Sequence, residues 1–412
     1  MREMKDSGNV WYGKIPYDWE LNKIKYLTTI RSESAIYNPE EDKYIGLENV
    51  NGYSDNVVET DTEYDYSMQS ICKKDDILFS KLRPYLAKVF IAKHNSFCTG
   101  EFIVFSSFNG DRRYLFYSIL NPKFIENINS STYGAKMPRA NPQYILDQQI
   151  CLPPLADQQR IAEFLDRECG KIDGLKADIQ AQIDTLEQYK RSVITEAVTH
   201  GLNPSAPMKD SGVDYIDKIK GDWRITKIGF VCSKLTRGFS AEDPALICSN
   251  NGSVMLRDEE KACGKMVSED NAMQGIHIGD IAIHGMDTWH GAIGFSKIKG
   301  KITRVVHVCD STEDKRFIVY YLKSLAYQNV YKLISNGVRG NTSDFRSWDK
   351  VKDIYICLPA TKKEENEICD YLDAQCENID MIIADKKLQI ETLDGYKKSL
   401  IYEYVTGKKE AV

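Results

Sequence analysis

The sequence contains two copies of one unit. Residues 4–8 recur letter for letter as residues 208–212, and Trp19 and Trp223 continue the match at the same offset. Residues 164–199 match 371–406 in a second block. The segments between these blocks, roughly 30–140 and 234–345, share almost no alignable identity. We therefore expect a pseudo-two-fold chain of variable, constant, variable and constant parts, which suits a partner with two similar halves.

Composition indicates an ordinary globular protein rather than a membrane or secreted one. Of the 412 residues, 42% are hydrophobic and 28% charged, and no apolar run approaches the roughly 18 residues of a membrane span. The N-terminus has no apolar stretch of signal-peptide type, so we expect a cytoplasmic location. The 11 cysteines contain no CxxC and are expected to be reduced. The six histidines lack zinc-site spacing, so no metal site is expected.

The net charge of −6 argues superficially against nucleic-acid binding. Its distribution changes that interpretation. Residues 157–200 contain six basic and nine acidic side chains, and residues 361–406 contain six basic and eleven acidic ones. These two segments together have a charge of −8, which leaves +2 for the rest of the chain.

Both constant segments have the heptad pattern of long helices that pack along one stripe. Each follows a proline-containing strand end, 150–154 or 356–359, and each would be roughly 65 Å long at about 1.5 Å per residue. The expected coiled-coil positions are Leu165, Ile172, Ile179, Leu186, Val193, Leu372, Ile379, Leu393 and Leu400, with Lys386 as an interruption. Each helix could simply cover its own neighbouring domain. Alternatively, the two pair in antiparallel fashion and hold the variable domains at opposite ends, with residues 200–207 as a linker.

The variable segments are predicted to be mixed α/β domains with exposed reading loops. Runs at 44–50, 77–80, 102–105 and 279–284 are of strand type. The loops after 77–80 and 279–284 differ completely, and a second basic or aromatic loop follows later in each copy. Interleaved basic and aromatic side chains are typical of base-edge and phosphate recognition. The predicted DNA-binding residues are Lys81, Arg83, Tyr85, Lys88, Tyr133, Lys136, Arg139, His284, Met286, Thr288, Trp289, His290, Arg339, Asn341 and Arg346. The alternative for each of them is a solvated charge or an aromatic packed into the core.

No catalytic motif is complete. Residues 141–144, Asn-Pro-Gln-Tyr, resemble the Asn-Pro-Pro-Tyr of DNA amino-methyltransferases, but Gln143 breaks the motif and no glycine-rich cofactor loop follows a strand. A turn before a strand at Ile145 is the preferred interpretation. Residues 259–261 contain the Glu-x-Lys of some nucleases without a convincing preceding aspartate. There is also no phosphate-binding loop of the P-loop type, so any chemistry is expected on another chain.

Several phrases together resemble the specificity subunit of type I restriction-modification systems along essentially the whole chain. They are residues 75–88, 133–139 and 152–162, and residues 279–280 with 286–294, which resemble a second class of recognition domain. The second helix departs from the pattern, because 358–366 lacks the Pro-Pro-Leu-x-x-Gln-Gln opening. The start of that helix and its partner contacts are accordingly less well defined.

The resemblance implies an α+β chain: target-recognition domains at 1–155 and 201–360, with spacer helices at 156–200 and 361–412 forming an antiparallel coiled coil. It also implies a non-catalytic reader of double-stranded DNA, in which each domain binds one half of an asymmetric bipartite target. The two half-sites would lie about one DNA turn (~34 Å) apart. The helices would dock two modification subunits. No cofactor is expected on this chain, since S-adenosylmethionine, ATP and Mg would belong to the modification and restriction subunits. The rival hypothesis is a scaffold or adaptor whose variable segments bind proteins.

Overall fold

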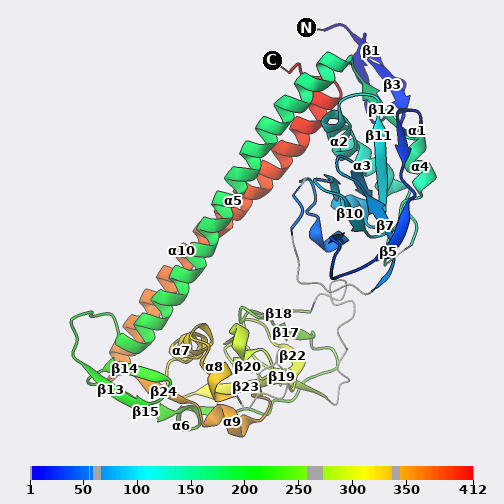
Figure 1. Ribbon diagram of the computed structural model, residues 1–412. Helices are drawn as coiled ribbons and strands as arrows, with labels where there is room; N and C mark the ends of the chain where they lie inside the picture. The colour runs from blue at the N-terminus through cyan, green and yellow to red at the C-terminus, as the bar shows by residue number, and fades with distance from the viewer. Residues whose placement is uncertain are drawn as a thin grey trace. The chain divides into compact units, whose positions relative to one another are not determined.

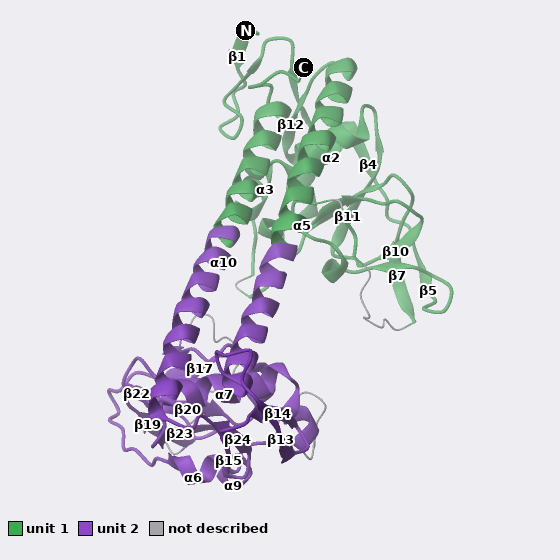
Figure 2. Ribbon diagram, turned by 90° about the vertical axis from the view of Figure 1, so that its left-hand side faces the viewer, with its two compact units in different colours: residues 1–180, 387–412 green, residues 181–386 purple. Residues whose placement is uncertain are grey.

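The computed structural model describes residues 2–54, 56–58, 66–134, 136–257, 272–335 and 344–411. The chain divides into two compact units (Figure 2). Unit 1 comprises 1–180 and 387–412, and unit 2 comprises 181–386. Each unit therefore contains one variable segment and parts of both long helices.

The two long helices, α5 (Leu155–His200) and α10 (Lys362–Val405), run beside each other in opposite directions (Figure 1). In unit 1, α5 pairs through Asp173 with Lys397 and through Lys176 with Asp394. The partner on α10 thus moves three residues toward the N-terminus when the residue on α5 moves three toward the C-terminus, as in an antiparallel pair. In unit 2, Gln182 accepts a hydrogen bond from Lys386, and Lys190 binds Asp380. These contacts give the helices the same antiparallel direction. The predicted antiparallel pair is confirmed.

Most of the predicted heptad positions are buried. Leu165, Ile172, Val193, Leu372, Ile379 and Leu400 are each no more than 9% exposed, whereas Ile179, Leu186 and Leu393 are half-buried. The helices also cover their neighbouring domains, as the other interpretation predicted. The first turns of α5 join the core of unit 1 through Ile161, and the last turns join the core of unit 2 through Val198. Both packing modes therefore operate.

The two variable segments share a sheet although their sequences do not align. In unit 1 the order is β4 (Thr28–Ile30), β11 (Phe102–Phe108), β8 (Ile77–Ser80) and β9 (Val89–Ile91). In unit 2 the order is β16 (Cys232–Lys234), β23 (Val306–Ser311), β20 (Ile281–His284) and β21 (Ile293–Phe295). All neighbours are antiparallel, and β8 pairs with β11 in the register in which β20 pairs with β23. Packing on the apolar faces, rather than residue identity, preserves this arrangement.

A second set of strands flanks each of these sheets. Unit 1 has β5 (Ser34–Tyr37), β7 (Ser67–Cys72), β10 (Ser96–Cys98) and β6 (Tyr44–Ile45) in that order. Unit 2 has the pairs β19 (Met273–Ile276) with β22 (Gly300–Thr303) and β17 (Leu246–Cys248) with β18 (Val254–Leu256). The strand predicted over 44–50 is wrong beyond Ile45. Residues Leu47–Asn49 form a 3-10 turn, because the Asn49 side chain accepts the Gly46 N–H at 2.7 Å.

The repeated sequence blocks form the frame around these sheets. Its strand pairs are β1 (Met4–Asp6) with β2 (Lys14–Pro16), β3 (Glu20–Lys23) with β12 (Gln149–Leu152), β13 (Met208–Val213) with β14 (Ile216–Lys220), and β15 (Arg224–Lys227) with β24 (Tyr355–Leu358). Trp19 and Trp223 are each 1% exposed. They lie against Gly407 and Gly201, whose positive φ ends the long helices.

Short helices complete each unit. They are α1 (Ile24–Leu27), α2 (Arg112–Leu120), α3 (Pro122–Ser130), α4 (Pro142–Asp147), α6 (Ile228–Val231), α7 (Lys315–Tyr327), α8 (Val330–Ile334) and α9 (Trp348–Lys352). The turn and strand predicted around Ile145 are wrong, because the segment is the helix α4. Asn141 caps it by accepting the Gln143 N–H at 2.9 Å, and Pro142 occupies its first turn.

The same polar contacts attach each variable domain to a long helix. In unit 1, Arg113 pairs with Asp166 on α5, and the Tyr117 hydroxyl donates to that carboxylate at 2.8 Å. In unit 2, Arg316 and Tyr320 make the equivalent contacts with Asp373 on α10, at 2.8 and 2.6 Å. Each domain is thus fixed to the helix that follows it in the chain.

Candidate nucleic-acid interface

In unit 1 the structure brings the two predicted reading loops together. At the end of β8, the Lys81 N–H donates to the Glu101 carbonyl at 2.9 Å, and the Lys81 carbonyl accepts from the Ala140 N–H at 2.9 Å. The Arg83 N–H also donates to the Pro138 carbonyl at 2.8 Å. Residues 81–88 and 133–139 therefore form one surface.

The exposed side chains of this surface are basic and aromatic. Arg83, Tyr85, Tyr133 and Lys136 are exposed, with Tyr85 at 50% and Tyr133 at 64%. Arg83 has φ 50°, in the left-handed region, and begins the 3-10 turn Pro84–Leu86. Left-handed backbone at a residue other than glycine is uncommon and often marks a functional loop. Of the readers predicted in unit 1, these four have exposed side chains.

Three other predicted readers have closer partners in the protein than Arg83, whose guanidinium donates to the Lys136 carbonyl at 3.4 Å. The Lys81 ammonium donates to the Gly100 carbonyl at 2.5 Å, and the Lys88 ammonium donates to the Leu47 carbonyl at 2.6 Å. The Arg139 guanidinium binds Glu101 at 2.8 Å, and this hydrogen bond lowers the pKa of that carboxyl. Lys81, Lys88 and Arg139 hold the loops in place here, and any DNA contact by them would require exchange of these partners.

Unit 2 holds its predicted reading loops by the same backbone contacts. The Gly285 N–H donates to the Val305 carbonyl at 3.0 Å, and the Gly285 carbonyl accepts from the Phe345 N–H at 3.0 Å. At the repeat offset, Gly285 and Val305 stand at the positions of Lys81 and Glu101. A 3-10 turn, Thr288–His290, likewise replaces Pro84–Leu86. We call this shared set of hydrogen bonds the loop clamp.

The predicted readers of unit 2 are placed unequally. His290 and Arg346 are exposed, while Met286 and His284 are half-buried. The Nδ1 atom of His284 lies 3.2 Å from the Asp287 carboxylate. Arg339 and Asn341 lie outside the described residues.

Thr288 and Trp289, two predicted readers of unit 2, pack within the protein itself. Thr288 is only 1% exposed, so its side chain is not presented at the surface. Trp289 is partly buried against the core of unit 2, with the Lys332 ammonium 5.9 Å from its ring centre. A large apolar ring next to a core is stabilised by burial, and a loop sequence alone does not reveal that neighbour.

A buried ion pair that was not predicted from the sequence lies at the start of both central strands. Arg31 binds both carboxylate oxygens of Asp76, at 2.6 and 3.1 Å, and Arg237 binds Asp280 at 2.6 and 2.8 Å. Asp76 and Asp280 are 1% and 2% exposed. Asp76 and Asp280 occupy equivalent positions in the repeat, just before β8 and β20. This match was the sequence signal from which the ion pair could have been predicted. The arginine partners could not be aligned.

Exposed apolar side chains recur on the helix pair. In unit 1, Tyr396 on α10 and Leu175 on α5 are 56% and 52% exposed, beside the Lys397–Asp173 ion pair. In unit 2, Tyr189 on α5 and Ile382 on α10 are 53% and 47% exposed. The repeat offset places Tyr189 at Tyr396 and Ile382 at Leu175, so the same pair of side chains is exposed twice. We call these the Tyr396 patch and the Tyr189 patch.

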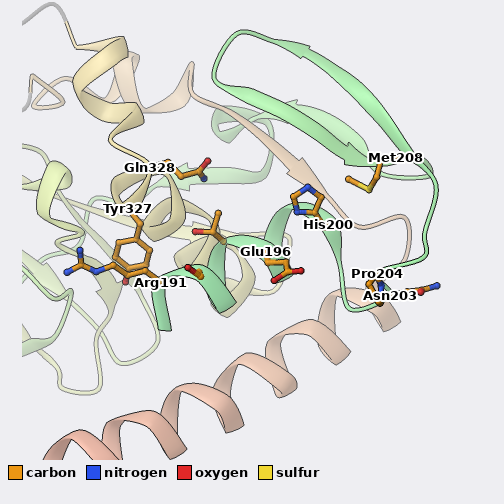
Figure 3. Close-up of a pocket in the computed structure, with 10 residues that line it drawn as sticks. Arg191, Glu196, His200, Asn203, Pro204, Met208, Tyr327 and Gln328 are labelled. Atoms are coloured by element: carbon orange, nitrogen blue, oxygen red, sulfur yellow. The ribbon is translucent and has the colours of Figure 1, made fainter. Parts of the chain in front are cut away.

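A cavity of about 570 Å³ lies at the carboxyl end of α5 in unit 2 (Figure 3). Two of its lining side chains contact each other, with the Arg191 guanidinium 5.5 Å from the centre of the Tyr327 ring. The lining residues are Arg191, Ser192, Thr195, Glu196, His200, Asn203, Pro204, Met208, Tyr327 and Gln328. None of them belongs to the reading loops, so this cavity is separate from the candidate interface.

The part of the chain that the structure describes contains no cluster of three or more potential metal ligands and no helix that could cross a membrane. Its ten cysteines are free and buried. The Glu-x-Lys of residues 259–261 lies outside the described residues.

Residues 16–185 match the family described as Type I restriction modification DNA specificity domain. Over that stretch the chain is similar to the specificity subunits of type I restriction enzymes, the family that the sequence resembles. It is 24% identical over 335 residues to the type I restriction enzyme MjaVIII specificity subunit of Methanocaldococcus jannaschii, which covers 72% of this chain and 70% of that subunit. It is 28% identical over 92 residues to the EcoBI specificity subunit of Escherichia coli, 22% of this chain and 19% of that one.

A chain in a solved structure of the type I R-M system has the same fold. It superposes with a TM-score of 0.65 at 13% sequence identity, covering 96% of this chain and 99% of that chain. The predicted fold class, α+β with two mixed domains and an antiparallel pair of long helices, is therefore confirmed.

Proposed function

We propose that this chain reads an asymmetric, bipartite DNA target for a type I restriction-modification complex. The observation that supports this proposal is the loop clamp. Its hydrogen bonds are the same in both units, but the loops that they hold have different side chains. Arg83, Tyr85, Tyr133 and Lys136 would read one half-site, and His290 and Arg346 would read the other. Arginine can bind guanine through two hydrogen bonds, and exposed aromatics can contact bases or sugars.

The helix pair would recruit the partners. Two equivalent apolar patches suit two copies of one protein, and the modification subunits of such a complex fit that requirement. In this proposal S-adenosylmethionine belongs to the modification subunits, while ATP and Mg belong to the restriction subunits. The present chain supplies recognition and spacing.

Selection from random duplexes tests the proposal. The full chain, assembled with its modification subunits, should enrich a bipartite motif with an unread spacer. Arg83→Ala should relax only one half of that motif and Arg346→Ala only the other, each by about 1 to 3 kcal/mol if the contact is bidentate. Arg167→Ala, an exposed arginine on α5, serves as the control and should leave the motif unchanged.

A protein scaffold is the rival function, favoured by the net charge of −6 and the exposed patches. A salt series separates the two. DNA readers release counterions, so duplex affinity should fall steeply between 50 and 200 mM salt, as expected for about six or more phosphate contacts. No salt-dependent duplex affinity in the assembled complex would reject DNA recognition.

A further inference from the structure

His307 is a buried imidazole inside the central sheet of unit 2. It lies on β23 opposite Ile283 of β20 and has 0% exposure. Its Nε2 is 2.7 Å from the carbonyl oxygen of Phe345. Because a carbonyl oxygen only accepts, Nε2 carries the proton and donates it. Nδ1 has no hydrogen-bond partner among the described residues, and burial lowers the pKa of this imidazole, which favours the neutral form.

The sheet itself does not require a histidine at this position. The repeat offset and the identical strand register place Ile103 of β11 where β23 has His307. Ile103 is 4% exposed and belongs to the core of unit 1. Burying a polar ring costs free energy for each nitrogen that lacks a hydrogen bond, and Nδ1 of His307 lacks one while Nε2 is bonded to the Phe345 carbonyl. The fold of unit 1 shows that an aliphatic side chain serves the packing role.

The hydrogen bond of His307 ends on the segment that carries a predicted reader. Phe345 is 3% exposed, and its N–H donates to the Gly285 carbonyl at 3.0 Å. A Cβ at Gly285 would lie 2.7 Å from the Phe345 oxygen, so the two backbones are in close contact. Phe345 is therefore held from both sides, by the loop after β20 and by the imidazole. The next residue, Arg346, is exposed.

We propose that His307 is a positioning residue that fixes Arg346 relative to the loop 285–291 and so sets base selectivity at the half-site read by unit 2. This inference rests on the proposed function. Unit 1 keeps the equivalent clamp bond, from the Ala140 N–H to the Lys81 carbonyl, but has Ile103 at the position of His307. A specific contact between an arginine and a base edge tolerates little displacement. If the Phe345 carbonyl were no longer held by His307, base selectivity at this half-site would fall while affinity for duplex DNA would remain.

Two substitutions separate positioning from packing. His307→Ile introduces the residue that unit 1 uses in the same sheet position and removes the donor. His307→Gln keeps an N–H donor at nearly the same reach. Each variant is assembled with the modification subunits and selected against random duplexes, and its melting temperature is measured. Ile103→Val, a change at the equivalent position of unit 1, is the matched control.

We expect His307→Ile to lower base preference at one or more positions of one half-site by at least about fivefold, with the other half-site unchanged. His307→Gln should restore the preference, and Ile103→Val should leave the half-site of unit 2 unchanged. If His307→Ile does not fold, His307→Asn, which is polar but too short to reach the Phe345 carbonyl, takes its place with the same expected outcome.

The inference is overturned if a folded variant without the hydrogen bond to the Phe345 carbonyl, His307→Ile or His307→Asn, selects the wild-type motif, or if both half-sites relax equally. Failure of the proposed function has a different signature, because the wild-type complex would then enrich no bipartite motif at all.

Discussion

Lys397 of α10 donates two hydrogen bonds to the carboxylate of Asp173 on α5, each 2.7 Å long. The repeat places Lys190 and Asp380 at the equivalent positions, and they make the same contact in unit 2 at 2.6 and 2.7 Å. One ion pair thus sets the antiparallel register twice. The two copies differ in burial, because the Lys397 side chain is 4% exposed and that of Lys190 is 26% exposed.

This difference predicts unequal costs for one substitution. Asp173→Ala leaves a buried ammonium without its carboxylate and should lower the free energy of unfolding by about 3 kcal/mol. Asp380→Ala leaves a partly hydrated ammonium and should cost less than about 1 kcal/mol. Urea unfolding followed by circular dichroism measures both values. Equal losses would show that burial of the lysine does not govern the contact.

Glu365 offers a pH-dependent test of the repeat. It is 2% exposed, and its Oε1 accepts the Asp314 N–H at 2.9 Å, as Gln158 does with the Asp111 N–H at 3.0 Å. Burial raises the pKa of the Glu365 carboxyl. A raised carboxyl pKa in the folded state means that stability falls as pH rises above about 4.5, the unfolded value.

We therefore expect Glu365→Gln to match the wild type near pH 4 and to exceed it at pH 7, by on the order of 1 kcal/mol. The new amide could donate as Gln158 does to the Pro153 carbonyl at 2.8 Å. Thermal unfolding at both pH values measures the difference. Gln158→Glu is the reciprocal control and should introduce the same loss at pH 7. A pH-independent difference would contradict the assignment.

His307 should produce the opposite pH dependence. Burial is the main reason that its pKa is lowered, and Lys234 on β16 and His284 on β20 add to the effect. Because the unfolded imidazole binds a proton more readily, stability is full above about pH 6.5 and is lost as pH falls below it. Relative to His307→Gln, the wild type should lose up to about 1.4 kcal/mol per pH unit below that point. Parallel curves for the two proteins would show that His307 does not titrate in this way.

Removal of the Glu101 carboxylate should strengthen DNA binding. Glu101 is bound to Arg139 beside the reading loops of unit 1. Glu101→Gln frees a guanidinium and removes a negative charge, so duplex affinity should rise about threefold to tenfold, with the salt slope steeper by about one. Fluorescence anisotropy in a salt series measures both quantities. Glu126→Gln, on α3 and paired with Lys123, makes the same change in charge at another site. An equal rise in duplex affinity for that variant would show that net charge alone explains the effect.

The sequence predicted the frame of this protein better than the exposure of the side chains in its loops, for a physical reason. Heptad positions such as Leu165 and Leu372 repeat at a fixed spacing within one stretch of sequence. The pattern therefore predicts both long helices and the stripe of side chains that each helix buries. The strand preceding Lys81 was visible in both copies for the same reason. The helix at Pro142–Asp147 was missed because its Asn141 cap also suits a turn.

Side-chain exposure in the loops depends on neighbours distant in sequence. Trp289 lies against the core, and Lys88 reaches back to the Leu47 carbonyl. Neither contact leaves a local pattern. The loop clamp is a set of backbone hydrogen bonds and is therefore invisible to residue identity, which explains how unaligned segments present the same scaffold.

The Tyr189 and Tyr396 patches predict the stoichiometry of assembly. If each anchors one modification subunit, Tyr189→Ala and Tyr396→Ala should each weaken one site by about 2 kcal/mol, as truncation of an aromatic hot spot typically does. At concentrations near the dissociation constant, each single variant should form mainly the complex with one modification subunit, and the double variant should bind neither. Native mass spectrometry counts the subunits directly. Tyr26→Ala, which removes a 74% exposed ring on α1 away from the helix pair, should leave two subunits bound. Loss of both subunits from a single variant would mean that the patches do not act as separate sites.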